Sequence, residues 1–228
     1  MIDFHTHILP GIDDGSRDLE ETKEMLQEEA AQGVSHIVAT PHFYAHRRSI
    51  EYFLTRREGS LKKVAELNAP ILVGAEVYFF PGMGRADKLR SLCIGETDLI
   101  LVEMPFDQWT EEVYTEIKDI IYKQKLRVIL AHVERYPHFQ KKQDIWDRIM
   151  ELPLTVQLNA GSFTGGFRQR RFALNMLKQN GNVILGSDCH NMDTRRPNLS
   201  EARNIIKKKI GEGRLKQLDE TAANLLGV

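Results

Sequence analysis

Short apolar, β-branched runs alternate with longer amphipathic segments along the whole chain, and this rhythm constrains the fold more than any other feature. We predict seven strands, within residues 1–4, 35–40, 69–76, 97–105, 126–134, 154–162 and 182–190. Several of these runs are almost continuously apolar, as expected for parallel strands that are buried on both faces. The segments between them carry apolar residues at helical spacing. The alternation predicts an α/β fold of βα repeats, either a barrel or a doubly wound sheet.

Length and composition indicate one domain. A chain of 228 residues is long for one ordinary domain but normal for a single α/β barrel. We find no linker, no low-complexity segment and no glycine-rich phosphate loop of the dinucleotide or P-loop type. We therefore expect residues 1–228 to form a single domain.

Charge, cysteine content and hydropathy argue against a nucleic-acid-binding protein, a disulfide-rich secreted protein and a membrane protein. A formal net charge of -1 provides no bulk argument for binding nucleic acid or a membrane surface. Cys93 and Cys189 lie far apart, which argues against a disulfide framework and fits a reducing compartment. We see no signal peptide and no apolar run near the roughly 20 residues that cross a bilayer. We expect a cytoplasmic protein without membrane insertion.

The chain opens MIDFHTHILPGIDDG, with two histidines one residue apart. Side chains alternate in an extended chain, so His5 and His7 point to the same side and Thr6 to the other. Two imidazoles on one side of a strand end provide half of a metal site. Taken alone, the pair is also explained by chance, because the chain has eight histidines and two of them can fall close together.

Ionisable side chains recur where the predicted strands end, which is where parallel βα folds carry function. Six of the seven strand ends have such a residue, which chance explains poorly. The candidates are His5, His7, His42, Glu76, Glu103, His132, Asp188 and His190. Alternation places Cys189 on the opposite side from Asp188 and His190, which argues against a thiolate ligand. Asn159, at the remaining strand end, is expected to be structural.

This donor set mixes imidazole nitrogen with carboxylate oxygen. Such a set suits manganese, iron or zinc at an open catalytic centre better than a closed structural zinc site. One reactive ion cannot use eight protein ligands. We therefore expect two or three ions that share a bridging carboxylate.

The segments DFHTHILPGIDDG, TPHF, GAE, HVERY and SDCHN resemble the PHP (polymerase and histidinol phosphatase) metallohydrolases. Within that group, the chain most resembles the protein-tyrosine phosphatases encoded with capsule or exopolysaccharide genes in Gram-positive bacteria. The resemblance runs from Met1 to the NLLG tail. It implies a distorted seven-stranded, TIM-like (βα)7 barrel with a polynuclear metal site at the C-terminal strand ends. It also implies manganese, with iron or zinc as alternatives.

The resemblance further implies three divalent ions. It assigns the first to His5, His7, Glu76 and Asp188. It assigns the second to the bridging Glu76, Glu103 and His132, and the third to His42 and His190. Many PHP enzymes supply another histidine to the third ion from the loop after the first strand, whereas PGIDDG has none. Asp13 or Asp14 is the candidate substitute, and we name Asp14 as the candidate catalytic residue.

The implied reaction is hydrolysis of a phosphomonoester by in-line attack of a metal-bridging hydroxide. Three divalent ions against three or four carboxylates leave the pocket positive, which favours a phosphate dianion. Arg135 and Arg195 resemble the phosphate-binding arginines of the family, and their planar donors suit the oxygens of the transition state.

The leaving group favours phosphotyrosine over phosphoserine. A tyrosine phenolate, with a conjugate-acid pKa of about 10, departs with modest help, whereas an alkoxide needs a well-placed acid. We expect a phosphotyrosine protein substrate, a bacterial tyrosine kinase of capsular or exopolysaccharide synthesis. The alternatives are another PHP phosphoesterase, such as histidinol phosphatase, and a non-catalytic metal-binding interaction module. For the basic residues Arg47, Arg48 and Arg168 we favour a solvated surface over phosphopeptide binding.

Overall fold

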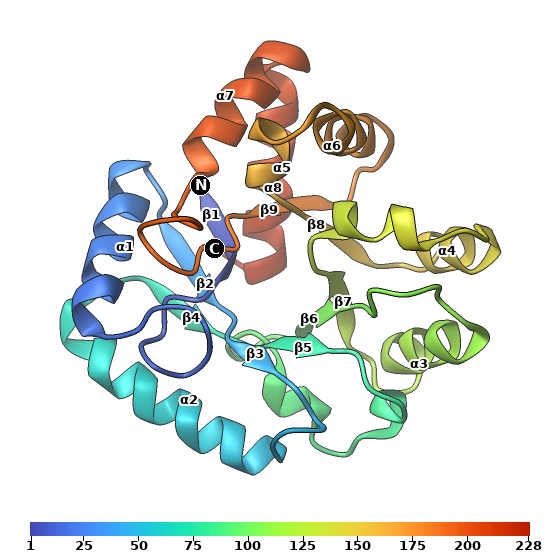
Figure 1. Cartoon of the computed structure of the whole chain (residues 1–228), viewed down its shortest axis with the longest axis horizontal. Coiled ribbons are helices and arrows are strands. Elements are labelled where there is room, and N and C mark those ends of the chain that lie inside the picture. Colours follow the sequence, from blue (N-terminus) through green and yellow to red (C-terminus); the bar gives the residue numbers. More distant parts are fainter.

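The computed structural model describes all 228 residues and consists of parallel strands with helices arranged around them (Figure 1). One sheet has the order β1-β2-β4. Its strands are Ile2–Thr6, His36–Ala39 and Ile71–Val73. The other sheet has the order β3-β5-β6-β7-β8-β9. Its strands are His42–Phe43, Glu76–Tyr78, Leu99–Glu103, Arg127–Leu130, Thr155–Asn159 and Val183–Gly186.

The predicted strands 35–40 and 69–76 correspond to β2 and β4, and each is followed after two residues by a short strand of the other sheet, β3 or β5, that the prediction did not include. Pro41, which has no backbone N–H, separates β2 from β3. Gly74 and Ala75 separate β4 from β5. A Cβ on Gly74 would lie 2.9 Å from the side chain of Ile94, so the backbone approaches its neighbour too closely for a larger residue. These breaks convert seven predicted runs into nine observed strands.

The α/β class with parallel strands is confirmed, but the predicted barrel does not close. Strand pairing is divided between two sheets. The register of β1 against β2 shifts between Asp3 and Thr6. Beyond β9, the chain returns to β1 through one isolated bridge, Thr6 to Cys189. A single bridge is not a continuous ladder, because β9 itself ends at Gly186 before the bridge forms.

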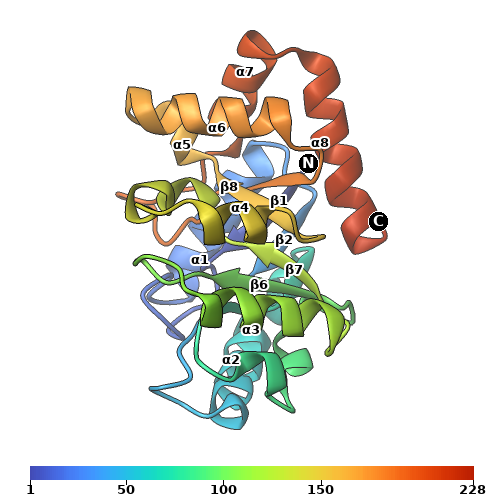
Figure 2. The ribbon, with the colours of Figure 1, turned by 90° about the vertical axis from the view of Figure 1, so that its right-hand side faces the viewer.

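The helices lie outside the strands in both views (Figures 1 and 2). They are α1 Leu19–Ala31, α2 Ile50–Val64, α3 Glu111–Tyr122, α4 Asp144–Met150, α5 Gly161–Thr164, α6 Phe167–Gln179, α7 Leu199–Lys209 and α8 Glu212–Leu226. Short 3-10 turns are η1 Ala65–Leu67, η2 Met83–Arg85, η3 Leu89–Leu92, η4 Val133–Arg135 and η5 Pro137–Phe139. The side chains of Asp18, Ser49 and Thr110 cap α1, α2 and α3 by accepting hydrogen bonds from backbone N–H groups. None of these helices is both long and apolar enough to cross a membrane.

Alternate residues of the central strands belong to two different apolar clusters. Val128 and Leu130 of β7 join a cluster of 46 buried residues that includes the strand-facing sides of the helices. Ile129 joins a smaller cluster of 10 residues, to which α8 contributes Ala222. Burial of both strand faces explains why the strands read as continuous apolar runs. The strand ends are then the positions where polar side chains can gather.

Candidate metal centre

The eight predicted donor side chains all gather at one end of the strands. They come from, or directly follow, β1, β3, β5, β6, β7 and β9. They are His5, His7, His42, Glu76, Glu103, His132, Asp188 and His190. His42 and Glu76 are paired in register between β3 and β5. The two strand breaks therefore bring these side chains next to each other.

Donor atoms of His5, His7 and Glu76 lie close to one another, and Asp188 adjoins the two histidines. His5 Nε2 lies 3.2 Å from His7 Nε2, and Glu76 Oε2 lies 3.2 and 3.3 Å from these two nitrogens. Asp188 Oδ1 lies 3.6 and 3.5 Å from the same nitrogens. Ligands held tetrahedrally at ~2.1 Å from an ion are about 3.4 Å apart. The spacing of the two nitrogens and Glu76 Oε2 fits a single divalent ion, and Asp188 Oδ1 is the neighbouring carboxylate oxygen.

Glu76 faces a second group through its other oxygen. Glu76 Oε1 lies 2.8 Å from Nε2 of His132, and Glu103 Oε1 lies 3.4 Å from the same nitrogen. The two oxygens of Glu76 thus point at different sets of donors. This is the arrangement that a carboxylate bridging two ions requires.

A third group brings Asp14 together with two histidines. Asp14 Oδ1 lies 3.6 Å from Nε2 of His42 and 3.7 Å from Nε2 of His190. The three side chains and His7 have donor atoms within 4.8 Å of one another. His190 Nδ1–H donates to the carbonyl of Asp188 at 3.0 Å, which directs its Nε2 toward this group. Asp14 therefore occupies the place for which the sequence offered two candidates.

Asp13 lies behind the donors instead. Its Oδ2 accepts a hydrogen bond from Nδ1 of His7 at 2.7 Å and from the backbone N–H of His42 at 2.9 Å. Carboxylates in this position fix the orientation of a ligating imidazole. A Cβ on Gly15 would lie 2.2 Å from the carbonyl oxygen of His7, so the tight DDG turn depends on glycine there.

The buried donor atoms fit a cation better than they fit one another. Glu76 Oε2 lies within 3.3 Å of ring nitrogens of His5, His7 and His42. It forms no hydrogen bond with any of them, and His190 Nε2 is also buried without a partner. Buried polar atoms without partners cost about 1–3 kcal/mol each. A divalent ion held among these nitrogens and oxygens would supply the missing partner.

The carboxylates of the cluster are held in the ionised form, whereas its histidines divide into two groups. Burial raises the pKa of Glu76 and of Asp188, but neighbouring histidines and, for Asp188, Arg135 hold both pKa values well below the ordinary range. Burial, reinforced by the positive charges of His7 and Arg195, lowers the pKa of His190 to about 3. Burial also lowers the pKa of His7, His42 and His132, but the neighbouring carboxylates outweigh it and raise the pKa of all three, to about 9 for His132. Because imidazoles bind metals in their neutral form, metal binding at these histidines would release protons.

Two donors stand on strained backbone. His132 has φ 29° and Asp188 has φ 56°, values in the left-handed region that side-chain-bearing residues rarely adopt. Such conformations cost of order 1–3 kcal/mol and cluster at functional sites. The surrounding packing thus holds both donors in place against a local preference.

Sequence reasoning missed Gln157, which links three parts of the site. Its Oε1 accepts from Nδ1 of His5 at 3.0 Å and from the backbone N–H of His132 at 2.7 Å. Its Nε2 donates to Asn159, whose amide donates to Asp188 Oδ2 at 2.8 Å. Gln157 and Asn159 are two residues apart in β8 and so share one face. A glutamine in the apolar run LTVQLN was the available signal.

Both predicted arginines lie at the solvent edge of the donor cluster. Arg135, at the end of η4, donates to Asp188 Oδ2. Arg195 Nη2 lies 2.7 Å from Asp188 Oδ1. About a third of each side chain is exposed, at 34% and 37%. The two guanidinium groups therefore reach the cluster from its open side.

Two residues next to the donors turn away from the cluster, and for Cys189 the alternation along the strand had predicted this. Glu134 accepts a hydrogen bond from the hydroxyl of Ser162 at 2.7 Å. Cys189 is fully buried and donates to Glu29 at 3.7 Å, so its sulfur lies apart from the donors.

Fold and site together define a class, an α/β protein with a cluster of histidine and carboxylate donors of the kind found in metallohydrolases. The chain belongs to the family described as capsular polysaccharide synthesis, CpsB/CapC, whose model matches residues 1–226. This confirms the resemblance to the capsule-associated family that the motifs indicated.

Relatives match along nearly the full length. The chain is 30% identical to the tyrosine-protein phosphatase YwqE of Bacillus subtilis, over 99% of this chain and 91% of that protein. It is also 30% identical to the tyrosine-protein phosphatase CpsB of Streptococcus pneumoniae, over 96% of this chain and 94% of that protein. A solved structure of YwqE and CpsB, described as metal-dependent tyrosine phosphatases, superimposes with a TM-score of 0.85 at 26% identity, covering 100% and 94% of the two chains. An enamidase of the amidohydrolase superfamily, with a TM-score of 0.57 and 16% identity, shares the fold alone.

Proposed function

We propose that the protein is a metal-dependent tyrosine-protein phosphatase of capsular or exopolysaccharide synthesis. The observation that carries this proposal is the convergence of eight imidazole and carboxylate donors with two arginines at one end of the strands. The relatives YwqE and CpsB, which match nearly the whole chain, bear the name tyrosine-protein phosphatase. We propose that the whole chain acts as one catalytic domain.

The three donor groups would hold three divalent ions, with manganese as the proposed metal and iron or zinc as alternatives. His5, His7, Glu76 and Asp188 would form the first site. Glu76, Glu103 and His132 would form the second, and Asp14, His42 and His190 the third. Bound ions would supply positive charge for the phosphoryl group and a nucleophile from water near neutral pH.

Arg135 and Arg195 would bind the non-bridging oxygens of the phosphoryl group. Each guanidinium has five N–H donors, and the side-chain contact of each in this structure is to Asp188. The remaining donors can meet a phosphate at the open side of the cluster. Planar donors fixed against a buried carboxylate need little reorganisation when charge develops on the phosphoryl oxygens.

The proposed substrate is phosphotyrosine in a bacterial tyrosine kinase. A phenolate with a conjugate-acid pKa of about 10 leaves without a strong general acid. We propose that this takes place in the cytoplasm, where the two free cysteines Cys93 and Cys189 would remain reduced.

Three substrates test the proposal. Purified protein is stripped of metal, reloaded with manganese, and offered a phosphotyrosine peptide, a phosphoserine peptide and histidinol phosphate. We expect manganese-dependent release of phosphate, with kcat/KM at least about tenfold higher for phosphotyrosine. A preference for histidinol phosphate would indicate another phosphoesterase of this fold. Inertness toward all three substrates would indicate a metal-binding interaction module.

A further inference from the structure

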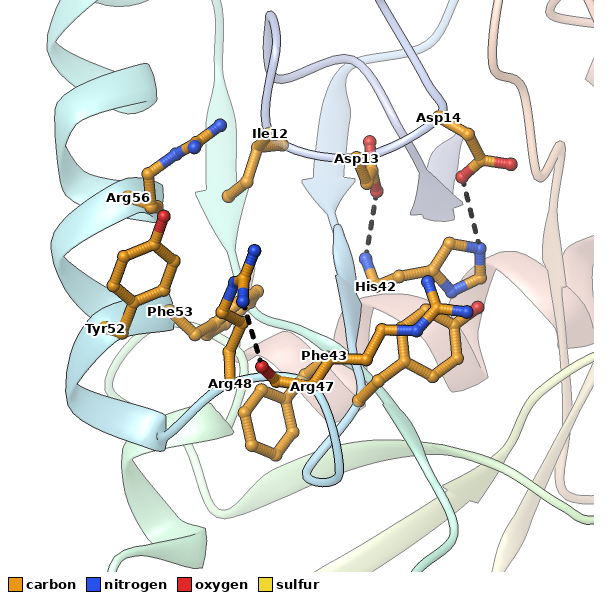
Figure 3. A pocket seen from close by; sticks show the side chains of 11 residues that line it. Ile12, Asp13, Asp14, His42, Phe43, Arg47, Arg48, Tyr52, Phe53 and Arg56 are labelled. Carbon is orange, nitrogen blue, oxygen red and sulfur yellow. Dashed lines mark hydrogen bonds and ion pairs between the residues drawn. The ribbon is translucent and has the colours of Figure 1, made fainter.

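A hollow of about 660 Å³ adjoins the third donor group and is lined by arginines and tyrosines (Figure 3). Its lining includes Ile12, Asp14, His42, Arg47, Arg48 and Arg56. Asp14 and His42 belong to the candidate metal centre, so the hollow opens directly from it. A chain bound at the metal centre through one phosphorylated residue can continue into this space.

The three arginines of this hollow have no carboxylate partner. Arg48 donates to the backbone carbonyl of Arg47 at 3.2 Å, and Arg56 donates to the carbonyl of Gly11. Neither these two side chains nor Arg47 forms an ion pair, unlike Arg127, which pairs with Asp98. Their charge is therefore available to an anionic ligand.

The carboxylates that line the hollow are already engaged. Asp13 accepts from His7 and His42, and Asp14 faces His42 and His190. Figure 3 shows both aspartates on the side of His42, with Arg56 on α2 across the hollow and Arg48 between them. The hollow is thus positive on the side away from the metal donors.

Aromatic rings hold two of the arginines and connect one of them to the donor cluster. The guanidinium of Arg47 lies 4.5 Å from the ring centroid of Tyr44, and that ring stacks on His42 at 5.2 Å. Arg48 lies 5.2 Å from the ring centroid of Tyr52. Stacked guanidinium groups lose less freedom on binding than free ones. Only the ring of Tyr44 therefore lies between Arg47 and His42, one of the candidate metal ligands.

We propose that this hollow binds acidic residues that flank the phosphotyrosine, so that the substrate class is a phosphotyrosine segment rich in aspartate and glutamate. The inference rests on the proposed phosphatase function and concerns the same site. Unpaired arginines recognise carboxylates through bidentate, charge-assisted hydrogen bonds. Their position next to His42 and Asp14 places this recognition beside the phosphoryl group.

The test compares two phosphotyrosine peptides of equal length, one with glutamates and one with alanines around the phosphotyrosine. We expect the manganese-loaded protein to cleave the acidic peptide with a kcat/KM about tenfold higher at low salt. This ratio should shrink toward one in about 0.5 M salt, since exposed charges are screened. In the double variant Arg47→Ala/Arg48→Ala we expect the ratio to fall about fivefold or more.

Arg90→Ala is the matched control. Arg90 is also exposed, it contacts only backbone carbonyls of Gln124 and Lys125, and it precedes β6, at the opposite end of the strands. This variant should keep the ratio of the unaltered protein. Equal kcat/KM for the two peptides, a ratio that survives the double variant, or an equal drop in Arg90→Ala would each overturn the inference.

A binding measurement separates this inference from the proposed function. The same two peptides carrying phosphonomethylphenylalanine in place of phosphotyrosine cannot be hydrolysed, so their affinities do not depend on turnover. Tighter binding of the acidic analogue, lost in the double variant, supports the hollow even if no peptide is cleaved. Equal affinities reject it even if the protein is an active phosphatase.

Discussion

Asp13 Oδ2 lies 2.7 Å from Nδ1 of His7, and this hydrogen bond turns Nε2 of the same ring toward Glu76. The neighbouring Asp14 points the other way, to His42 and His190. Two adjacent aspartates thus have different tasks, one orienting a donor and one serving as a donor. Burial raises the pKa of Asp13, but His7 and the hydrogen bonds it receives lower that pKa to about 2, so Asp13 stays ionised.

The two aspartates should therefore respond differently to substitution. Asp13→Asn should weaken metal affinity by about 10- to 100-fold, with turnover recovered in excess metal, because only the orientation of His7 is loosened. Asp14→Asn should instead reduce the number of bound ions at saturation. Metal titration with elemental analysis distinguishes the two, and identical behaviour would contradict the division of tasks.

Removal of a proposed ligand should abolish activity and leave the fold. His132→Ala and Asp188→Ala should each lower kcat by at least about a hundredfold and reduce bound metal, because both remove a donor from the buried centre. Circular dichroism should show the α/β signature unchanged. Rates near those of the unaltered protein in either variant would reject the ligand assignment.

Arg135 should matter for turnover and not for metal content. Its guanidinium contacts Asp188 from the open side and is placed to receive a phosphoryl oxygen. Arg135→Ala should lower kcat/KM by about 10²- to 10³-fold, and Arg135→Lys should recover part of the loss. Bound metal, measured in parallel, should stay constant, and loss of metal would mean that Arg135 acts by holding Asp188.

Gln157 should couple metal affinity to stability. Gln157→Leu leaves Nδ1 of His5 and the backbone N–H of His132 without their shared acceptor, at a cost of about 1–3 kcal/mol of folding free energy. Metal affinity should fall about 10- to 100-fold, because the imidazole of His5 and the backbone of His132 lose the acceptor that positions them. Thr155→Val, in the same buried strand, is the control and should leave metal affinity unchanged.

Glu29 should make stability fall as pH rises. Burial, with Asp3 nearby, raises the pKa of Glu29 to about 10. The folded state therefore keeps a proton that the unfolded state releases above its ordinary pKa near 4.5. The contribution of Glu29 to the free energy of unfolding is complete below the unfolded-state pKa. It declines by about 1.4 kcal/mol per pH unit above that value, until the pH reaches the pKa of Glu29 in the folded state.

The substitution Glu29→Gln removes the carboxyl group that holds this proton in the folded state. The melting temperature of the variant should vary less with pH than that of the unaltered protein between about pH 6 and about pH 9. Thermal melts across that range provide the measurement. Parallel pH profiles for the two proteins would show that Glu29 is not protonated in the folded state.

The alternation of apolar runs and helical segments was sufficient to predict the α/β class, seven of the nine strands and the eight side chains that gather at the strand ends. Buried parallel strands demand apolar runs, and polar residues then collect at their ends, so His5, Glu103 and Asp188 stand out in the sequence itself. Short-range periodicity carries this information because each strand imposes it locally.

Only the tertiary structure decided how these residues meet. The division of tasks between Asp13 and Asp14, the support from Gln157, and the unpaired charge of Arg47 depend on distances between segments far apart in the chain. The strand breaks and the single bridge from Thr6 to Cys189 likewise arise from packing between strands. A local pattern records which side a residue faces, whereas its partners are set by how all the strands and helices pack at once.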